Sequence, residues 1–271
     1  MVIRMQVSTA QIPGPAESQD RVVVTDHMAL VLDGASAFEP VDVPTGLYVD
    51  LLGEGIRTCL DQQPDIELAT AVASAIEAAA QELQLKPGNA PSSTVSLLRV
   101  RDDGVDLLSL GDSAIYYGND DGETGGLTDS RLANLGIPEH RAYRNRVAAG
   151  HGYDARHREL LADLQREQRK RRNRPEGYWI AEAEPDAANH ALALTVPRGR
   201  ITWAVLATDG AYGPMFHLGL ADWKARAHEG ASKLEKILKF CEDWERHEDP
   251  DGRKLPRAKV SDDKTLAAVL V

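Results

Sequence analysis

The sequence is poor in cysteine, in positive charge and in long apolar runs, and each shortage argues against a class of protein. Its two cysteines, Cys59 and Cys241, lie on the apolar stripes of expected helices, where a free thiol behaves as a small buried hydrophobe, so we assign them no chemistry. No apolar run is long enough to span a bilayer, and residues 1–20 lack the continuous apolar core of a secretory signal. We therefore expect a soluble, cytoplasmic protein with no membrane partner.

Acidic residues outnumber basic ones, with 42 Asp and Glu against 31 Lys and Arg, so the formal net charge is -11. A surface of this sign repels nucleic acid, and we expect no nucleic-acid partner. The 271 residues, 42% of them apolar, lie near the upper limit for one hydrophobic core. We expect one domain over residues 1–271.

Short segments rich in aliphatic or β-branched residues and bounded by polar turns predict strands. They are Val2–Ser8, Arg21–Val24, Met28–Leu32, Thr94–Val100, Val105–Leu110, Ala114–Tyr117, Ala191–Val196, Ile201–Ala207 and Thr265–Val271. Apolar residues at helical spacing predict helices over 48–60, 68–83 and 234–244. This order of strands, paired helices, strands and again strands and helices indicates an α+β fold rather than a βαβ array.

Residues 118–189 mix an acidic turn, a basic run and Gly/Pro punctuation, which is typical of a variable surface region. The basic run at 166–174, REQRKRRNR, is interpreted first as a solvated helix face and alternatively as a surface for an acidic partner or RNA. Tyr178 and Trp179 are expected to anchor the region on the core. The histidines show no metal-ligand spacing, and we expect most of them at the surface.

Five Asp-Gly pairs occur, and an Asp-Gly pair usually marks a turn. We interpret three of them, at 103, 121 and 251, as turns only. The pairs at Asp33 and Asp209 differ because each ends an apolar strand, MALVL and WAVLAT, so that a rigid scaffold holds the carboxylate. These two aspartates are the first candidate ligands.

Two more acidic positions lie at strand ends, since Asp262 precedes the closing strand and Asp20 precedes RVVV. If the strands bring these four ends together, several carboxylates share one site, and their repulsion is costly unless cations neutralise it. Oxygen ligands of this kind favour Mg²⁺ or Mn²⁺ over zinc. Acidic residues at strand ends are also common turn formers, and spacing alone leaves both interpretations open.

Taken in series, six motifs resemble the PP2C (PPM) family of metal-dependent protein phosphatases over nearly the whole chain. They are SQD at 18–20, VLDGAS at 31–36, SSTV at 92–95, LGDSAIYY at 110–117, LATDGAYG at 206–213 and SDDKTLAAVLV at 261–271. The resemblance implies a four-layer αββα sandwich of two antiparallel sheets flanked by helices, with residues 118–189 as a flap-like region beside the site. It also implies phosphorylated proteins as substrates.

The resemblance further implies two Mn²⁺ or Mg²⁺ ions. Asp33 would bridge both ions, the Gly34 carbonyl would reach one, and Asp209 and Asp262 would complete the other site. Asp20 would hold ion-bound water or contact an ion itself. Catalysis would be hydrolysis of phosphoserine or phosphothreonine by water activated at Asp33, Asp209 and Asp262, without a phosphoenzyme.

Several positions depart from the pattern of the family. Gln19 replaces a common Glu, Ala35 replaces a common His that can act as general acid, and Pro15 occupies the place of a phosphate-binding Arg. A weaker third ion would use Asp112 with an Asp at the place of Gly213, so Asp112 is either a ligand or a structural brace. These departures keep open a non-catalytic PP2C-like binding or scaffold module. A further alternative keeps the metal centre and changes the substrate: a metal-dependent hydrolase acting on nucleotides or nucleic acid, although the net acidity argues against polynucleotides.

Overall fold

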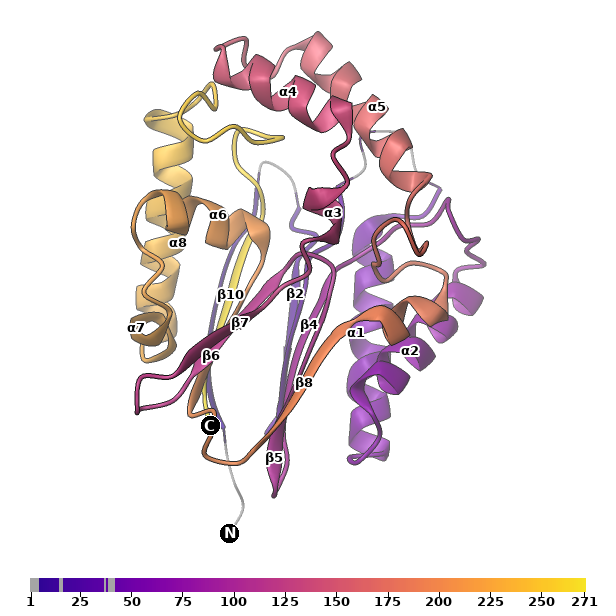
Figure 1. Cartoon of the computed structure of the whole chain (residues 1–271), viewed down its shortest axis with the longest axis vertical. Helices are drawn as coiled ribbons and strands as arrows, with labels where there is room; N and C mark the ends of the chain where they lie inside the picture. The colour runs from indigo at the N-terminus through magenta and orange to yellow at the C-terminus, as the bar shows by residue number, and fades with distance from the viewer. Residues whose placement is uncertain (1–4, 15–16, 37, 39–41) are drawn as a thin grey trace.

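The computed structural model describes residues 5–14, 17–36, 38 and 42–271. Two antiparallel sheets of five strands pack face to face, and helices cover both outer faces (Figure 1). The first sheet has the order β1 (Gln6–Ile12), β10 (Lys264–Leu270), β9 (Trp203–Ala207), β6 (Ala114–Gly118), β7 (Thr124–Leu127). The second has the order β2 (Arg21–Val24), β3 (Met28–Leu32), β4 (Val95–Val100), β5 (Gly104–Leu110), β8 (Leu192–Pro197). The predicted α+β sandwich of four layers is confirmed.

The helices fall into three groups (Figure 1). The second sheet is covered by α1 (Thr45–Gln62), α2 (Leu68–Glu82) and the 3-10 helix η1 (Pro185–His190). The first sheet is covered by α6 (Asp209–His217), α7 (Trp223–Ala227) and α8 (Ala231–His247). Above one end of the sandwich lie α3 (Arg131–Asn134), α4 (Pro138–Ala148) and α5 (Ala155–Arg169).

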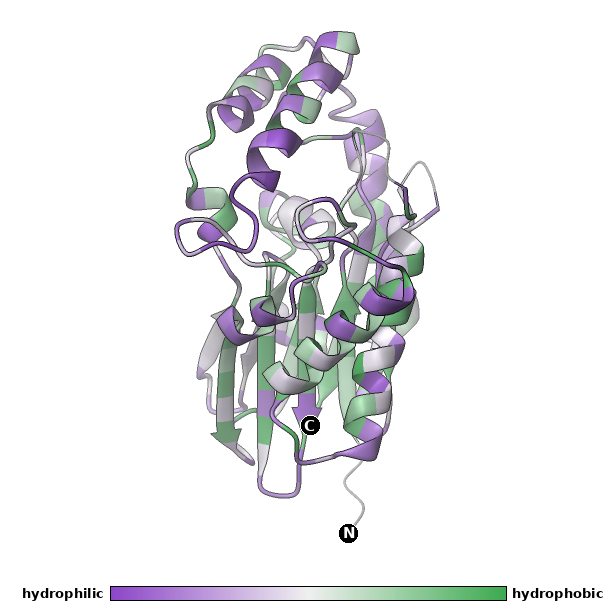
Figure 2. Ribbon diagram, turned by 90° about the vertical axis from the view of Figure 1, so that its right-hand side faces the viewer, coloured by the Kyte–Doolittle hydropathy of each residue, from purple (hydrophilic) through white to green (hydrophobic). Residues whose placement is uncertain are grey.

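Strand β3 shows why the layers form, because all of its residues are buried but they face opposite ways. Met28, Leu30 and Leu32 pack against α1 and α2, whereas Ala29 and Val31 pack between the sheets. Successive side chains of a strand point to opposite faces, so an unbroken apolar strand requires cover on both. In Figure 2 the strands are coloured largely as hydrophobic, whereas the helices above one end of the sandwich are mostly hydrophilic.

The predicted strands and helices agree with the structure to within a few residues, with one larger difference and several omissions. Strand β1 runs to Ile12, beyond the predicted end at Ser8, while residues 2–4 of that prediction lie outside the described part. Strand β7 was missed because its sequence, TGGL, has no strand pattern. Of the two cysteines, Cys241 is buried as predicted, but Cys59 is only half-buried.

Helices α4 and α5 form a hairpin with a small apolar core of its own, which the interpretation of 118–189 as a surface region did not anticipate. Its buried members are Ile137, Tyr143, Val147, Leu160, Leu161 and Leu164. His157 is also buried, against the expectation for most histidines, and its Nε2 donates to the Ala258 carbonyl at 2.8 Å. This bond ties the hairpin to the loop that precedes β10.

The basic run at 166–174 is only partly a solvated helix face. Arg166 and Lys170 make exposed ion pairs along or just after α5. Arg172, by contrast, is buried and pairs with the buried Glu182 at 2.8 Å, because the chain turns back to the sandwich at this point. Tyr178 and Trp179 are buried there as predicted.

In the part of the chain that the structure describes, no helix is long and apolar enough to cross a membrane.

Candidate metal centre

The acidic positions at the strand ends meet at the end of the sandwich that faces the α4–α5 hairpin. Asp33 follows β3, Asp209 is the first residue of α6, and Asp262 precedes β10. The three side chains line one cavity of about 190 Å³, together with Gly34 and Asp112. Five of the six predicted site residues therefore share a single cavity.

Asp33 is fixed by hydrogen bonds to the start of β4. Its backbone N–H donates to Thr94 Oγ1 at 3.3 Å, and its carbonyl accepts from the Thr94 N–H at 3.0 Å and from Ser93 Oγ at 3.1 Å. Gly34 is required by close packing, since a Cβ at this position would lie 2.8 Å from the Gln19 carbonyl oxygen. The Asp-Gly pair thus brings the Asp33 segment against the segment that carries Asp20.

Asp20, the sixth predicted residue, lies beside the cavity and is 2% exposed. Its Oδ2 accepts from Thr265 Oγ1 at 2.6 Å and from Thr208 Oγ1 at 3.2 Å. Its Oδ1 is buried and has no hydrogen-bond partner among the described residues, and the same holds for Gln19 Oε1. Two buried oxygens at the edge of the cavity are therefore left without a donor.

Asp209 and Asp262 are brought together by a second close approach. A Cβ at Gly210 would lie 2.0 Å from the Asp263 carbonyl oxygen, so only glycine lets α6 begin against this segment. The Asp263 carboxylate faces away from this contact and accepts from the backbone N–H groups of Gly14, at 2.7 Å, and Gln19, at 2.9 Å. Asp263 thereby holds the chain that leads to Asp20.

One cation of the chain contacts the cluster directly. Lys259 Nζ donates to Asp262 Oδ1 at 2.5 Å. Burial opposes the charged form of Lys259, but Asp262, Asp263 and Asp33 outweigh it and raise the pKa of the ammonium group. Lys259 therefore stays protonated, and a cation bound at Asp262 would have to displace it.

The carboxylates raise one another's pKa values. Desolvation of the carboxylate by the surrounding protein raises the pKa of Asp33 well above its usual range. The charges of four other carboxylates raise it further, namely those of Asp20, Asp209, Asp262 and Asp112. Desolvation also raises the pKa of Asp209 to about 7, with smaller contributions from the charges of Asp112, Asp262 and Asp20. Burial likewise raises the pKa of Asp20 to about 7, against the hydrogen bonds from the two threonines. Among the described residues, the ammonium group of Lys259 is the only cationic group that contacts these carboxylates, and it does not balance their combined negative charge.

Asp112 occupies the turn between β5 and β6 and lines the same cavity. Its backbone carbonyl accepts from Thr128 Oγ1 at 3.1 Å and from the Tyr212 hydroxyl at 3.0 Å, which braces α6 against this turn. Gly213 faces open space, since a Cβ there would meet nothing within 4 Å.

Pro15, at the place of the phosphate-binding Arg of the family, lies outside the described residues. The nearby Arg21 pairs with Asp50 at 2.5 Å.

The donor set suits hard divalent cations, which prefer carboxylate and carbonyl oxygens. The unpartnered Asp20 Oδ1 and the raised pKa values of Asp33 and Asp209 are consistent with a site whose charge is balanced by cations from solution. As they stand, no three His, Cys, Asp or Glu side chains of the described residues are grouped closely enough to hold a metal ion. Binding would therefore need side-chain rotations, including separation of Asp262 from Lys259.

Several residues of the site were missed by sequence reasoning. They are the two threonines on Asp20, the carboxylate of Asp263, and the basic side chains of Lys259, His140 and Arg144. The adjacent acids Asp262 and Asp263 were a usable signal, because two neighbouring residues before a strand have side chains on opposite sides. His140 and Arg144, four residues apart, were detectable as one helix face.

Comparisons with known proteins identify the fold. The fold is shared by the catalytic domain of the serine/threonine protein phosphatase PstP in complex with two manganese ions, at 15% identity, 99% coverage of both chains and a TM-score of 0.54. It is also shared by the PPM phosphatase MsPP from Mycobacterium smegmatis in complex with cacodylate (18% identity, 99% and 98% coverage, TM-score 0.55). PppA, a regulatory component of T6SS in Pseudomonas aeruginosa, is similar too (15% identity, 99% and 98% coverage, TM-score 0.57).

These solved structures define the class of fold, the bacterial PPM phosphatase sandwich. The family model described as Protein phosphatase 2C matches residues 16–254, and the chain belongs to that family. A search of curated proteins finds no match.

Proposed function

We propose that the chain is a metal-dependent protein serine/threonine phosphatase, in which Asp33, Asp209, Asp262 and Asp20 hold two Mn²⁺ or Mg²⁺ ions, with the Gly34 carbonyl as a further ligand. The observation that carries the proposal is the convergence of carboxylates from four separate segments on one cavity with Lys259 as the one cation of the chain in direct contact with them, within the described residues. Membership of the family and the two manganese ions of PstP support the same choice.

In this proposal the ions supply a water of lowered pKa and screen the charge that develops on the phosphoryl oxygens. The residues of the chain position the reaction. Asp33 is rigid because β4 holds its backbone, and Asp20 is rigid because two threonine hydroxyls hold one of its oxygens. Because both residues are held at strand ends, the positions of their carboxylate oxygens are fixed, as a preorganised site requires.

Ala35 stands where the resemblance places a histidine that can act as general acid, so this position supplies no proton to the leaving oxygen. The ionised leaving group of a seryl or threonyl phosphate is basic, so its proton is expected from water in the cavity. Neither cysteine contributes a nucleophile, because burial raises the pKa of both thiols, that of Cys241 to about 12.

The test is hydrolysis of p-nitrophenyl phosphate and of a phosphothreonine peptide with Mn²⁺, with Mg²⁺ and with EDTA. Wild type is compared with Asp33→Asn and Asp209→Asn, which keep the side-chain volume and remove the charge. Turnover that needs a divalent cation and is lost in both variants supports the proposal. A folded wild type that hydrolyses neither substrate with either ion refutes it.

A second candidate is a non-catalytic binding or scaffold module. It is favoured by one specific observation, the ion pair of Lys259 with Asp262, which satisfies a proposed ligand from within the chain. Such a module would bind a phosphoprotein equally well with Mn²⁺ and with EDTA, and Asp33→Asn would leave that binding unchanged.

A further inference from the structure

We infer that Arg144, on the α4–α5 hairpin, is a substrate-binding residue that takes a phosphoryl oxygen of the substrate, with Lys259 on the opposite side of the same anion. This inference rests on the proposed function, because it assigns the recognition of the phosphate at the same site. A larger cavity of about 280 Å³ lies beside the carboxylates and is lined by basic side chains.

Four basic side chains line this cavity, and they differ in what they already bind. They are His140, Arg144, Arg257 and Lys259. Arg257 is occupied by protein oxygens, among them Asp249 Oδ2 at 2.7 Å and the Glu245 carbonyl at 3.0 Å. Lys259 is paired with Asp262. Arg144 is half-buried and has a side-chain hydrogen bond with Tyr143, but it makes no ion pair within the part of the chain that the structure describes.

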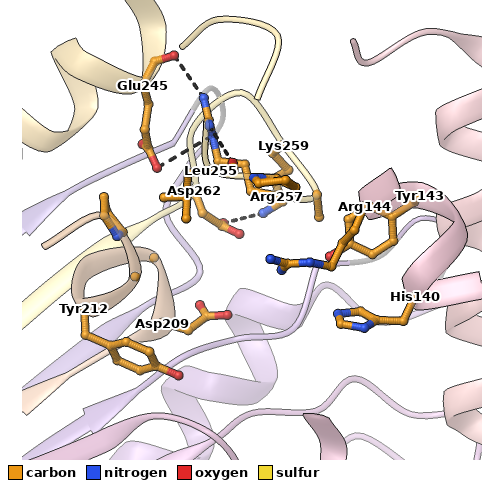
Figure 3. Close-up of a pocket in the computed structure, with 15 residues that line it drawn as sticks. His140, Tyr143, Arg144, Asp209, Tyr212, Glu245, Leu255, Arg257, Lys259 and Asp262 are labelled. Atoms are coloured by element: carbon orange, nitrogen blue, oxygen red, sulfur yellow. Dashed lines mark hydrogen bonds and ion pairs between the residues drawn. The ribbon is translucent and has the colours of Figure 1, made fainter. Parts of the chain in front are cut away.

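Arg144 is aimed at the carboxylates but does not reach them. Figure 3 shows its side chain pointing from α4 toward Asp209 and Asp262, on the side of the cavity opposite α6. Both aspartates line this cavity and the smaller one that holds Asp33. The space between the guanidinium and the aspartates is thus continuous with the candidate metal centre, and a small tetrahedral anion would contact both sides.

The hairpin holds Arg144 in this position. Its neighbour Tyr143 and, one turn on, Val147 are buried in the apolar core that joins α4 to α5. Ala258, next to Lys259, packs on that core, and its carbonyl accepts the hydrogen bond from His157. The two proposed phosphate contacts, Arg144 and Lys259, are therefore mounted on elements that are bonded to each other.

Charge balance favours an anion here. Two divalent cations would neutralise the four carboxylates proposed as ligands, and they would release Lys259 from Asp262. Arg144 and Lys259 would then face a phosphate monoester, which is close to a dianion at neutral pH. Asp112 adds at most one negative charge. His140 adds no positive charge near pH 7, because burial and the Arg144 charge lower the pKa of its imidazole.

Guanidinium groups bind phosphate through paired hydrogen bonds, and one charge-assisted bond changes affinity about 10- to 100-fold. We therefore expect Arg144→Ala to weaken binding of inorganic phosphate to the Mn²⁺-loaded full chain by that factor in calorimetric titrations. The kcat/KM values for p-nitrophenyl phosphate and for a phosphothreonine peptide should fall by the same factor as each other. Arg144→Lys should lie between wild type and Arg144→Ala, because it keeps the charge and loses the paired geometry.

The matched control is Arg141→Ala, which removes the same charge from an exposed position of α4 that lines none of the described cavities. It should leave phosphate binding and both kcat/KM values unchanged. Unchanged phosphate binding in a folded Arg144→Ala protein overturns the inference. A loss confined to the phosphopeptide also overturns it, since Arg144 would then contact the peptide rather than the phosphoryl group.

The outcomes separate this inference from the proposed function. Phosphate binding that depends on Arg144 in a protein without hydrolysis would support the inference and refute the phosphatase. Metal-dependent hydrolysis that is unchanged in Arg144→Ala would support the phosphatase and refute the inference about Arg144. A wild type that neither binds phosphate nor hydrolyses the two substrates would refute both.

Discussion

Two buried aspartates of this molecule differ in what surrounds them, although they are almost equally inaccessible to solvent. Asp106 is 4% exposed and Asp20 is 2% exposed. Asp106 accepts from Arg99 at 2.7 Å and Arg101 at 2.8 Å, and these bonds outweigh burial and lower its pKa. Asp20 has only hydroxyl donors, and burial raises its pKa to about 7.

The comparison teaches that burial alone does not distinguish a structural acid from a candidate ligand. A buried carboxylate is stable when the fold supplies its cation, as the arginines do for Asp106. The acids around Asp33 have Lys259 as their one direct cationic contact in the described structure. We infer that their remaining charge is balanced from solution, by the ions of the proposed metal centre.

The largest expected effect is on hydrolysis. Asp33→Asn should reduce metal-dependent turnover by on the order of 10³-fold, because a bound cation is worth several kcal/mol in the transition state. The same substitution should not destabilise the metal-free fold, since it removes a charge that its neighbours oppose. Turnover is measured with p-nitrophenyl phosphate and stability by urea unfolding with EDTA. A strong loss of stability would show that Asp33 is a structural acid.

Removing an arginine that pairs with Asp106 should, in contrast to Asp33→Asn, destabilise the fold. Arg99→Met leaves Asp106 with a weaker set of donors in a buried place, and we expect a loss of about 3 kcal/mol in the free energy of unfolding. Arg57→Met, which breaks an exposed ion pair on α1, serves as the control and should change stability little. An Arg99→Met protein as stable as the control would contradict this account of Asp106.

The two aspartates should also respond oppositely to pH. The pKa of Asp106 is lowered by folding, so its contribution to stability is present above about pH 4 and is lost as the pH falls below that. The pKa of Asp20 is raised to about 7, so the metal-free protein loses stability as the pH rises from about 4 to 7. Asp20→Asn should weaken this second dependence, to which Asp33 and Asp209 also contribute because their pKa values are raised as well. Urea unfolding at pH 5 and pH 8 measures it, and equal pH dependence in wild type and variant would refute the assignment.

The smallest expected effect concerns the weaker third ion. Gly213→Asp adds a carboxylate where a Cβ would meet nothing within 4 Å, at the position that the resemblance pairs with Asp112, and we expect binding of Mn²⁺ to tighten by roughly 10-fold at one site, about the effect of one added charge-assisted contact. Gly213→Asn has the same shape without the charge and should not tighten it. Calorimetry distinguishes the two variants, and identical titrations would argue that Asp112 is only a brace.

Local patterns predicted the sandwich well, because both faces of its strands are covered and the sequence therefore carries continuous apolar runs such as MALVL. The α4–α5 hairpin was not predicted, since its polar surface hides a core of a few residues. The signals were present: Pro138 opens α4, and the Asp154 side chain caps α5.

The candidate site was predicted as a set of carboxylates but not as an arrangement. The resemblance selected Asp33, Asp209 and Asp262, and the structure places them in one cavity. Their ligand roles remain a prediction. The ion pair of Lys259 with Asp262 and the position of Arg144 beside the site depend on segments brought together only by folding, and no local pattern encodes such an arrangement.

The central claim is that the acidic cluster balances its charge with two divalent cations, and a calorimetric titration of Mn²⁺ into the metal-free full chain tests it most directly. The account predicts binding of two equivalents, loss of at least one in Asp33→Asn, and an unchanged stoichiometry in Arg141→Ala. A folded wild type that binds no Mn²⁺ at millimolar concentration would contradict it.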